Sequence, residues 1–209
     1  MSKPHSENSK MITRALNTHK PEEQRKLYNE WAPTFDDEVL GLSYVAPQMG
    51  AALMASATYD RSGVILDLAC GTGLVAQELA GHGFVIIDGA DVSEGMLDIA
   101  RKQGLYRNLC RTDLTKSLDF TADSYAGTIC IGTLGTHIDA KVLGEMVRIT
   151  KSGGAICISV RSGQYQPAGY GEKIKSLYLN SSVQIVVEET HDYIQKDGAS
   201  AVYCVLRVI

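Results

Sequence analysis

A glycine-rich turn is the segment of this chain best suited to binding a ligand. Residues 64–69 are apolar except for Asp67, Gly71 and Gly73 follow with one residue between them, and residues 74–80 have helix-forming character. This pattern predicts a strand, a turn without bulky side chains, and a helix, so that backbone can approach a ligand closely. The first amides of a helix lack partners within it and face whatever lies over the turn. We therefore predict a site for a nucleotide-like cofactor here.

Asp91 is the second chemical feature of this region. It ends the next predicted strand, about 20 residues after the glycine turn, where a carboxylate binds the hydroxyls of a ribose. The glycine pattern with Asp91 fits both NAD and S-adenosylmethionine, because each presents an adenosine to this edge of a sheet. A glycine-rich turn that binds no ligand is the remaining interpretation.

Three observations favour S-adenosylmethionine over NAD. Asp67 stands just before the glycine turn, where an acid repels a pyrophosphate but suits the ammonium group of a methionine. Asp113 closes the third predicted strand and can accept a hydrogen bond from an adenine amino group, with Leu114 covering the ring; a carboxylate on a surface turn is the alternative for Asp113. After one nucleotide-binding half, a predicted hairpin follows, which leaves no room for a separate substrate domain.

Composition and charge narrow the class of protein. The 209 residues are 44% hydrophobic and 21% charged, as expected for a globular protein with a substantial core, and the net charge is −4. This charge argues against a nucleic-acid substrate, although a local basic patch would still allow RNA binding. No apolar run approaches the roughly 20 residues that cross a bilayer, so no membrane association is expected.

The cysteines and the polar N-terminus suggest a location. None of the five cysteines lies in a Cys-x-x-Cys pair, and most fall in apolar, strand-like runs. We expect buried reduced thiols, no metal site and a cytoplasmic protein. Residues 1–20 show no apolar core of signal-peptide type and are predicted to form a flexible arm, with a helical segment near residues 11–16.

The elements that position these residues alternate between strand and helix. After two N-terminal helices, at residues 21–31 and 47–58, strands are predicted at residues 64–69, 84–90, 106–111, 125–131 and 155–161, with helices at 74–80, 94–103 and 140–150. Gly153 and Gly154 are predicted to turn the chain into the fifth strand. A helix at 172–179 precedes strands at 183–193 and 199–208, joined by a hairpin turn at residues 196–198.

This order of elements predicts an α/β fold. We expect a Rossmann-like, seven-stranded mixed sheet, mostly parallel with an antiparallel C-terminal hairpin, covered by helices on both faces. Residues 21–209 are predicted to form a single domain, in which residues 21–60 are a helical cap and residues 61–209 are the core.

From about Tyr28 onward, the chain resembles the class I S-adenosylmethionine-dependent methyltransferases. Within that class, four segments are similar to the methyltransferase-like proteins of the Williams–Beuren syndrome critical region: Tyr28–Asp36, Leu42–Pro47, Ile65–Ala76 and Ser93–Leu97. The glycine motif is specific to the class, whereas the N-terminal signature points to the subgroup. The resemblance implies S-adenosylmethionine as cofactor and S-adenosylhomocysteine as its product.

The resemblance also implies roles for individual residues. Ala69, Gly71 and Gly73 would line the methionine and sulfonium end, Asp91 would hold the ribose, Met96, Asp113 and Leu114 would bracket the adenine, Gly132 would lie beneath the cofactor, and Tyr28 would reach its carboxylate. Ala69 replaces the first glycine of the fuller glycine pattern, a substitution that the class tolerates.

The sequence gives weaker indications for the part of the site that would bind the methyl acceptor. Tyr28, Trp31, Phe35 and Tyr44 are predicted to fold over the cofactor as a lid, and aromatic faces favour a cationic sulfonium. Trp31 is the better pocket candidate, because Phe35 suits an ordinary packing stripe equally well.

Two further side chains follow the fourth and fifth strands. His137 is a candidate general base, or else a solvated loop histidine, because methyl transfer by positioning needs no base. Arg161 faces the same edge and pairs either with a substrate carboxylate or with an internal acid.

We therefore expect methyl transfer to a small-molecule acceptor. The alternatives are a catalytically silent cofactor-binding protein that acts through a partner, and an NAD-dependent oxidoreductase. No particular oligomeric state and no particular acceptor atom is indicated.

Overall fold

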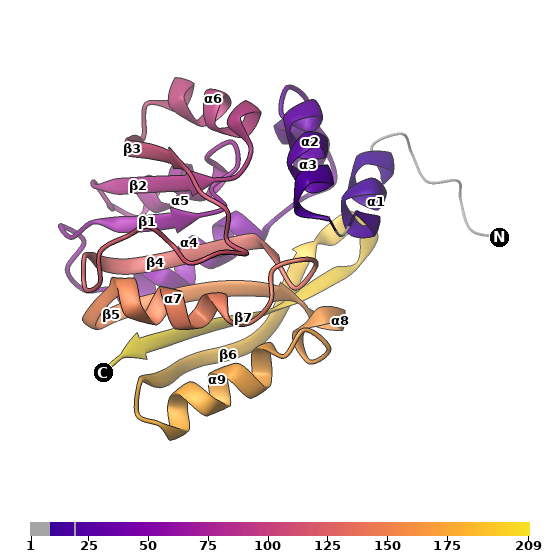
Figure 1. The fold of residues 1–209 in the computed structure, drawn as a ribbon. Helices are drawn as coiled ribbons and strands as arrows, with labels where there is room; N and C mark the ends of the chain where they lie inside the picture. Colours follow the sequence, from indigo (N-terminus) through magenta and orange to yellow (C-terminus); the bar gives the residue numbers. More distant parts are fainter. Residues whose placement is uncertain (1–8, 19) are drawn as a thin grey trace.

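The alternation of strand and helix produces one seven-stranded sheet (Figure 1). The structure is a computed structural model that describes residues 9–18 and 20–209. The strands are β1 (Ile65–Leu68), β2 (Ile87–Asp91), β3 (Tyr106–Arg111), β4 (Tyr125–Leu134), β5 (Thr150–Arg161), β6 (Val183–Ile194) and β7 (Ala199–Val208), in the order β3-β2-β1-β4-β5-β7-β6.

The sheet is mixed in the way the sequence predicts. Strands β1 to β5 pair in parallel, whereas β7 runs antiparallel to both of its neighbours, β5 and β6. Gly198, at the turn between β6 and β7, adopts a φ of 69°, which a glycine reaches at no steric cost. Because β6 is antiparallel to β7, it runs in the same direction as β5, and its carboxyl end lies at the same edge of the sheet.

Helices cover both faces of the sheet (Figure 1). They are α1 (Ser9–Asn17), α2 (Pro21–Trp31), α3 (Phe35–Gly41), α4 (Ala46–Ala57), α5 (Leu74–Gly81), α6 (Glu94–Gln103), α7 (Val142–Ile149), α8 (Ser162–Tyr165) and α9 (Tyr170–Leu179). Alternate residues of each strand face opposite sides: Ile156 packs with α7 and α9, and Cys157 packs with α4 and α5. The expected two-faced architecture is thus confirmed.

The fifth strand differs from its prediction. It begins at Thr150 rather than at residue 155, and Gly153 and Gly154 lie inside it instead of forming the turn before it. The pairing with β4 shifts there, from Tyr125 opposite Thr150 to Gly127 opposite Ala155. Gly153 has a φ of 78°. Between these two pairs β5 has three more residues than β4, so the two glycines lie in an irregular segment within the strand.

Other boundaries move for similar reasons. Strand β4 continues to Leu134, past Gly132, whose φ of 92° accommodates a second irregularity in its pairing with β5. Strand β2 begins at Ile87, where pairing with β1 begins, rather than at residue 84. Helix α7 is shorter than its prediction, and the short helices α3 and α8 were not predicted.

The N-terminal segment contributes a helix to the cap. The predicted arm falls partly outside the described residues, at positions 1–8 and 19, and residues 9–17 form α1. Ala15 of α1 packs in a small apolar cluster with Leu27, Trp31 and Val39. Arg14 and Glu30 form a two-pronged ion pair, with both N–O distances 2.9 Å. The helix α1 is therefore attached to α2 by apolar and charged contacts.

Among the described helices, none has the length and apolar character required to cross a membrane.

Candidate functional site

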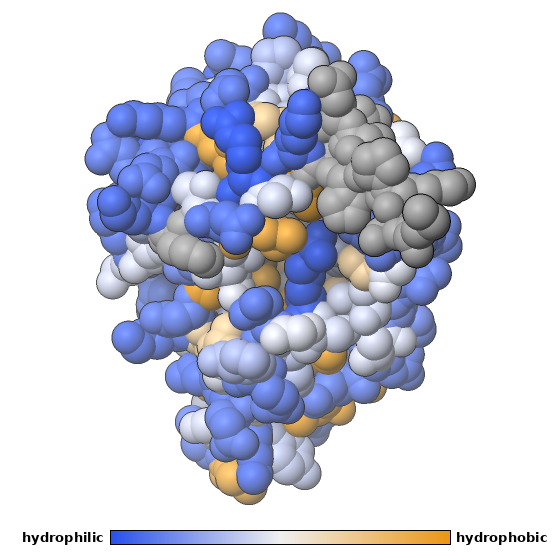
Figure 2. All heavy atoms as spheres, turned by 90° about the vertical axis from the view of Figure 1, so that its right-hand side faces the viewer, coloured by the Kyte–Doolittle hydropathy of each residue, from blue (hydrophilic) through white to orange (hydrophobic). Residues whose placement is uncertain are grey.

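A cavity of about 1430 Å³, including the part open to solvent, lies at the carboxyl edge of the parallel strands. Its walls come from the glycine turn, the ends of β2, β4, β5 and β6, and the helices α1 to α4. Figure 2 views this side of the molecule and shows apolar residues recessed among hydrophilic ones. Its lining is largely apolar, with a few polar and charged side chains among the apolar ones, as is typical of a site for a small molecule.

The glycine turn opens directly into this cavity. Ala69, Gly71 and Gly73 all have positive φ values, of 56°, 54° and 102°. A Cβ added to Gly71 would meet no atom within 4 Å, so the backbone is bare on the cavity side. Ala69 adopts the left-handed conformation despite its methyl group, which costs an L-residue roughly 1–2 kcal/mol. The turn is therefore shaped for close approach of a ligand.

Asp91 is fixed at the wall of the cavity by backbone amides. Its Oδ2 accepts a hydrogen bond from the Gly71 N–H (2.9 Å), and its Oδ1 accepts one from the Ser93 N–H (2.8 Å). Burial raises the pKa of this carboxyl, and the backbone hydrogen bonds oppose that rise. Each carboxylate oxygen has a further lone pair available. The carboxylate therefore fits the two hydroxyls of a ribose.

The residues assigned to adenine lie in the same cavity as Asp91. Met96 and Leu114 are buried apolar side chains of its lining. Asp113 also lines it, and its Oδ1 accepts hydrogen bonds from the amide (3.0 Å) and the hydroxyl (2.6 Å) of Thr115. Asp113 thus belongs to a turn and to the cavity wall at once. These three residues are brought together, and their role toward adenine stays a prediction.

Asp67 and Gly73 lie beneath the turn rather than in the cavity lining. Asp67 is 1% exposed, and its Oδ2 accepts a hydrogen bond of 2.7 Å from the Tyr106 hydroxyl. Burial raises the pKa of Asp67 to about 7, although the Tyr106 hydrogen bond opposes this. A Cβ on Gly73 would lie 3.3 Å from the Tyr106 ring. Both residues therefore support the turn from below, and any direct contact with a cofactor stays a prediction.

The predicted aromatic lid forms one wall. Tyr28 and Trp31 stack with 5.8 Å between ring centroids, and Phe35 meets Trp31 edge-on at 4.8 Å. All three line the cavity, as does Tyr44. The Trp31 Nε1–H donates to Glu38 (3.0 Å), so its polar edge is satisfied within the cap. Phe35 both packs against Trp31 and lines the cavity, so it has the features of a lid residue and of a packing residue at once.

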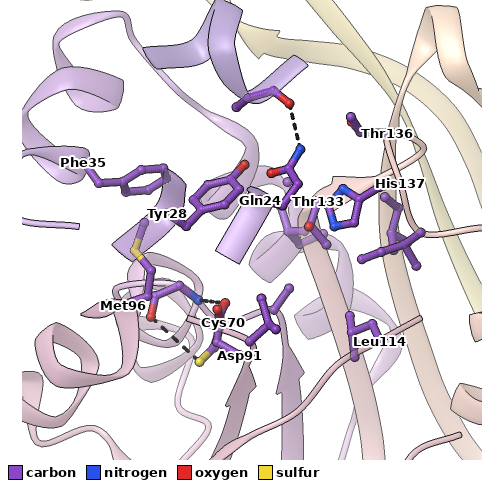
Figure 3. A pocket seen from close by; sticks show the side chains of 18 of the residues that line it. Gln24, Tyr28, Phe35, Cys70, Asp91, Met96, Leu114, Thr133, Thr136 and His137 are labelled. Atoms are coloured by element: carbon purple, nitrogen blue, oxygen red, sulfur yellow. Dashed lines mark hydrogen bonds between the residues drawn. The ribbon is translucent and has the colours of Figure 1, made fainter. Parts of the chain in front are cut away.

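The acceptor side is built from β4, β5 and β6. His137, predicted as a general base, lines the cavity with Thr133 and Thr136, as Figure 3 shows. Gly132 lies beside the Tyr44 hydroxyl, where a Cβ would collide with it. The Gly132 carbonyl accepts a hydrogen bond of 3.0 Å from the Tyr193 hydroxyl. Gly132 therefore allows two tyrosines to gather at the end of β4.

Three important lining residues were not predicted. Tyr193 is the next-to-last residue of β6 and could have been found from topology, because that end of β6 lies at the carboxyl edge. Thr72, between the two glycines, is 1% exposed and donates to a carboxylate of α3. Gln24 of α2 projects toward the cavity (Figure 3), and its Nε2 donates to the carbonyls of Ala15 (2.8 Å) and Thr18. Its position depends on the docking of α1, which has no sequence signal.

Comparison with known proteins places the central part of the chain among methyltransferase domains. A family model described as a methyltransferase domain matches residues 65–154. The human methyltransferase-like protein 27 is 35% identical over 149 residues, which cover 68% of this chain and 60% of that protein. A demethylmenaquinone methyltransferase of Renibacterium salmoninarum is 29% identical over 150 residues, covering 71% and 62%. The chain thus spans less than two thirds of the length of these relatives.

Solved structures share the fold at low sequence identity. The cyclase SpnF superposes with a TM-score of 0.61 at 17% identity, covering 77% of this chain and 80% of the other. An S-adenosylmethionine-dependent methyltransferase from Thermotoga maritima gives a TM-score of 0.59, also at 17% identity, covering 88% and 98%. These likenesses show a common architecture.

Proposed function

We propose that this chain transfers a methyl group from S-adenosylmethionine to a small-molecule acceptor. The proposal starts from the family of the chain, which belongs to the class I S-adenosylmethionine-dependent methyltransferases. The observation that carries the proposal is the pair of hydrogen bonds that hold the Asp91 carboxylate against the bare glycine turn. Such a carboxylate, beside a turn without side chains, suits an adenosyl group.

Residues of the cavity suit the different parts of the cofactor. Asp91 would bind the ribose, Met96, Asp113 and Leu114 would surround the adenine, and Ala69 and Gly71 would line the methionine end near Tyr28. When bound, S-adenosylmethionine supplies a methyl group that the positive charge on sulfur activates toward attack.

The chain's own contribution is mainly one of positioning. The aromatic residues Tyr28, Trp31 and Phe35 exclude water and favour a cationic group by about 0.5–2 kcal/mol per contact. Alignment of two reactants in such a site contributes up to about 7–11 kcal/mol to lowering a barrier. His137 would accept the proton that a hydroxyl or amine acceptor releases.

A small-molecule acceptor is favoured by the enclosure of the cavity. Helices α1 and α2 supply Ile12, Leu16 and Gln24 to its wall, so that the cap covers the acceptor side. The net charge of −4 provides no excess of positive charge for a nucleic acid.

Binding without methyl transfer is the second candidate. The fold by itself does not decide between the two, since one architecture serves different reactions. In that case the chain would bind the cofactor and act through a partner.

Calorimetry and an activity assay test these proposals in turn. We expect S-adenosylhomocysteine to bind and to raise the melting temperature, whereas NADH should not. The chain should then transfer a labelled methyl group to at least one component of fractionated metabolite pools. Binding without any labelled product would favour the silent binding protein, and stabilisation by NADH alone would favour an oxidoreductase.

A further inference from the structure

We propose that Arg161 binds a carboxylate of the acceptor, so that the acceptor is an organic acid with a flat apolar body. This inference rests on the proposed methyl transfer and concerns the acceptor half of the same cavity.

Arg161 presents a positive charge to the cavity. It is the last residue of β5 and lines the cavity. Within residues 9–18 and 20–209, no carboxylate forms an ion pair with it. The other charged lining residues, Asp91 and Asp113, are acids that already accept hydrogen bonds from neighbouring groups. Arg161 is thus the one arginine or lysine in the described lining, and an anion entering the cavity would meet it.

The side chain of Arg161 is held in a suitable orientation. Its guanidinium carbon lies 4.8 Å from the centroid of the Tyr193 ring. Stacking against an aromatic face fixes the plane of a guanidinium and leaves its edge N–H groups available for a two-pronged contact with a carboxylate. Tyr193 is itself anchored by its hydroxyl to the Gly132 carbonyl and packs edge-on against Tyr44 at 5.2 Å. The arginine is therefore supported by a fixed aromatic wall.

The position of Arg161 in the sheet assigns the anion to the acceptor. The glycine turn follows β1, Asp91 ends β2, and Asp113 follows β3, so the residues suited to the adenosyl group lie on one side of β4. Arg161 ends β5, on the other side of β4. His137 also lines the cavity, and it follows β4, the strand between these two halves. An anion at Arg161 would therefore place a second molecule beside both the cofactor and His137.

The shape of the walls indicates the rest of the acceptor. Tyr28, Tyr44 and Tyr193 line the cavity together with the apolar side chains of Ile131 and Ile138. Flat aromatic and aliphatic surfaces favour a flat, apolar body, and the arginine favours an acid at one end. An aromatic carboxylic acid has both properties.

The test uses the full chain saturated with S-adenosylhomocysteine, and a set of aromatic carboxylic acids, each paired with its own neutral primary amide. Affinities are measured by ligand-observed NMR at neutral pH. We expect acids to bind about tenfold more tightly than their amides, as for a charge-assisted contact. In Arg161→Gln this preference should fall to about twofold or less, whereas Arg161→Lys should keep part of it. Lys102→Gln, which removes an exposed charge on α6, should leave the preference unchanged.

Three results would overturn the inference. These are equal binding of acids and amides by the unmodified chain, an unaltered acid preference in Arg161→Gln, and a loss of about tenfold or more in S-adenosylhomocysteine affinity in that variant. The last would assign Arg161 to the cofactor's own carboxylate. If Arg161→Gln does not fold, the acid preference of the unmodified chain must weaken as salt is added. Absence of any S-adenosylhomocysteine binding would instead count against the proposed function.

Discussion

The Thr72 hydroxyl donates a hydrogen bond of 2.5 Å to the Asp36 carboxylate, and thereby joins the glycine turn to helix α3. A second contact links the cap to the same edge of the sheet: Asn29 Oδ1 accepts hydrogen bonds from the Ser93 hydroxyl (2.8 Å) and the Gly95 N–H (2.9 Å). The first contact reaches the glycine turn, and the second reaches the start of α6 just after Asp91. The position of the cap is therefore coupled to the shape of the glycine turn.

Thr72→Val should loosen this coupling. The substitution keeps the shape of the side chain but removes the donor to the half-buried Asp36 carboxylate, a contact worth about 0.5–1.5 kcal/mol. We expect weaker S-adenosylhomocysteine binding by about three- to tenfold, measured by calorimetry. Ser56→Ala removes a hydroxyl that donates to a carbonyl of its own helix, and this variant should bind S-adenosylhomocysteine as tightly as the unmodified chain. Equal behaviour of the two variants would show that the contact has no influence on the turn.

Asp91→Ala should abolish most of the cofactor affinity while the domain stays folded. The variant removes both the ribose ligand and the acceptor for the Gly71 amide. We expect S-adenosylhomocysteine affinity to fall at least a hundredfold by calorimetry, with a cooperative melting transition retained. Asp88→Ala is the matched control: Asp88 is buried on the same strand but pairs with Arg107 on the neighbouring strand. Unchanged affinity in Asp91→Ala would refute the ribose assignment.

Asp67 should make stability depend on pH below neutrality. Burial raises its pKa in the folded state to about 7, against an ordinary value of 3.8. The folded state therefore binds more protons between these values, and the free energy of unfolding should fall as the pH rises from about 4 to about 7. The effect is at most ~4 kcal/mol, from about 1.4 kcal/mol per pKa unit.

Asp67→Asn isolates this contribution. The amide does not titrate, so the difference in the free energy of unfolding between the two proteins should change over that pH range and become constant above it. Urea denaturation at several pH values measures it. Asp91 shifts in the same direction, and its charge also helps to raise the pKa of Asp67, so the difference reports Asp67 together with this coupling. A difference that is independent of pH would contradict the raised pKa.

Ala69→Gly should be tolerated or stabilising. The φ of 56° at this position strains an alanine but not a glycine, and the relief is offset by the greater backbone freedom of glycine when unfolded. We expect a change between zero and about 1 kcal/mol in favour of the variant. Ala76→Gly, inside helix α5, should instead destabilise by about 1 kcal/mol. Thermal denaturation compares them, and equal destabilisation would contradict the argument from strain.

His137→Gln should reduce turnover without affecting cofactor binding. A positioned base contributes typically 10²- to 10⁴-fold, and glutamine cannot accept the proton. Once an acceptor is known, kcat should fall within that range while S-adenosylhomocysteine affinity changes less than twofold. Thr136→Val, a neighbour in the same lining, serves as the control. Unchanged kcat would leave positioning alone as the source of rate enhancement.

Local sequence patterns predicted the sheet well, because strand–helix alternation and glycine punctuation act over short distances. They placed the start of β5 too late, since Gly153 and Gly154 lie in an irregular segment inside the strand and not before it. They also missed α3, whose formation depends on contacts such as Trp31 with Glu38.

The residues of the candidate site were likewise predicted only in part. The residues that follow parallel strands, among them Asp91, Asp113 and His137, were located from their order in the sequence, because the carboxyl ends of parallel strands converge. Gln24 was not found, since its place in the cavity depends on how α1 packs against α2. Arg161 was identified, but only the folded structure shows that no internal acid pairs with it among the described residues.

The lining of the cavity comes partly from the segment that matches the methyltransferase domain and partly from the segments that flank it. The matched methyltransferase domain covers residues 65–154, whereas Gln24, Tyr44, Arg161 and Tyr193 all lie outside it. Arg161 and Tyr193, which we assign to the acceptor, both belong to the flanking segments. Chimeras that exchange these flanking segments between relatives should carry substrate preference with the flanks.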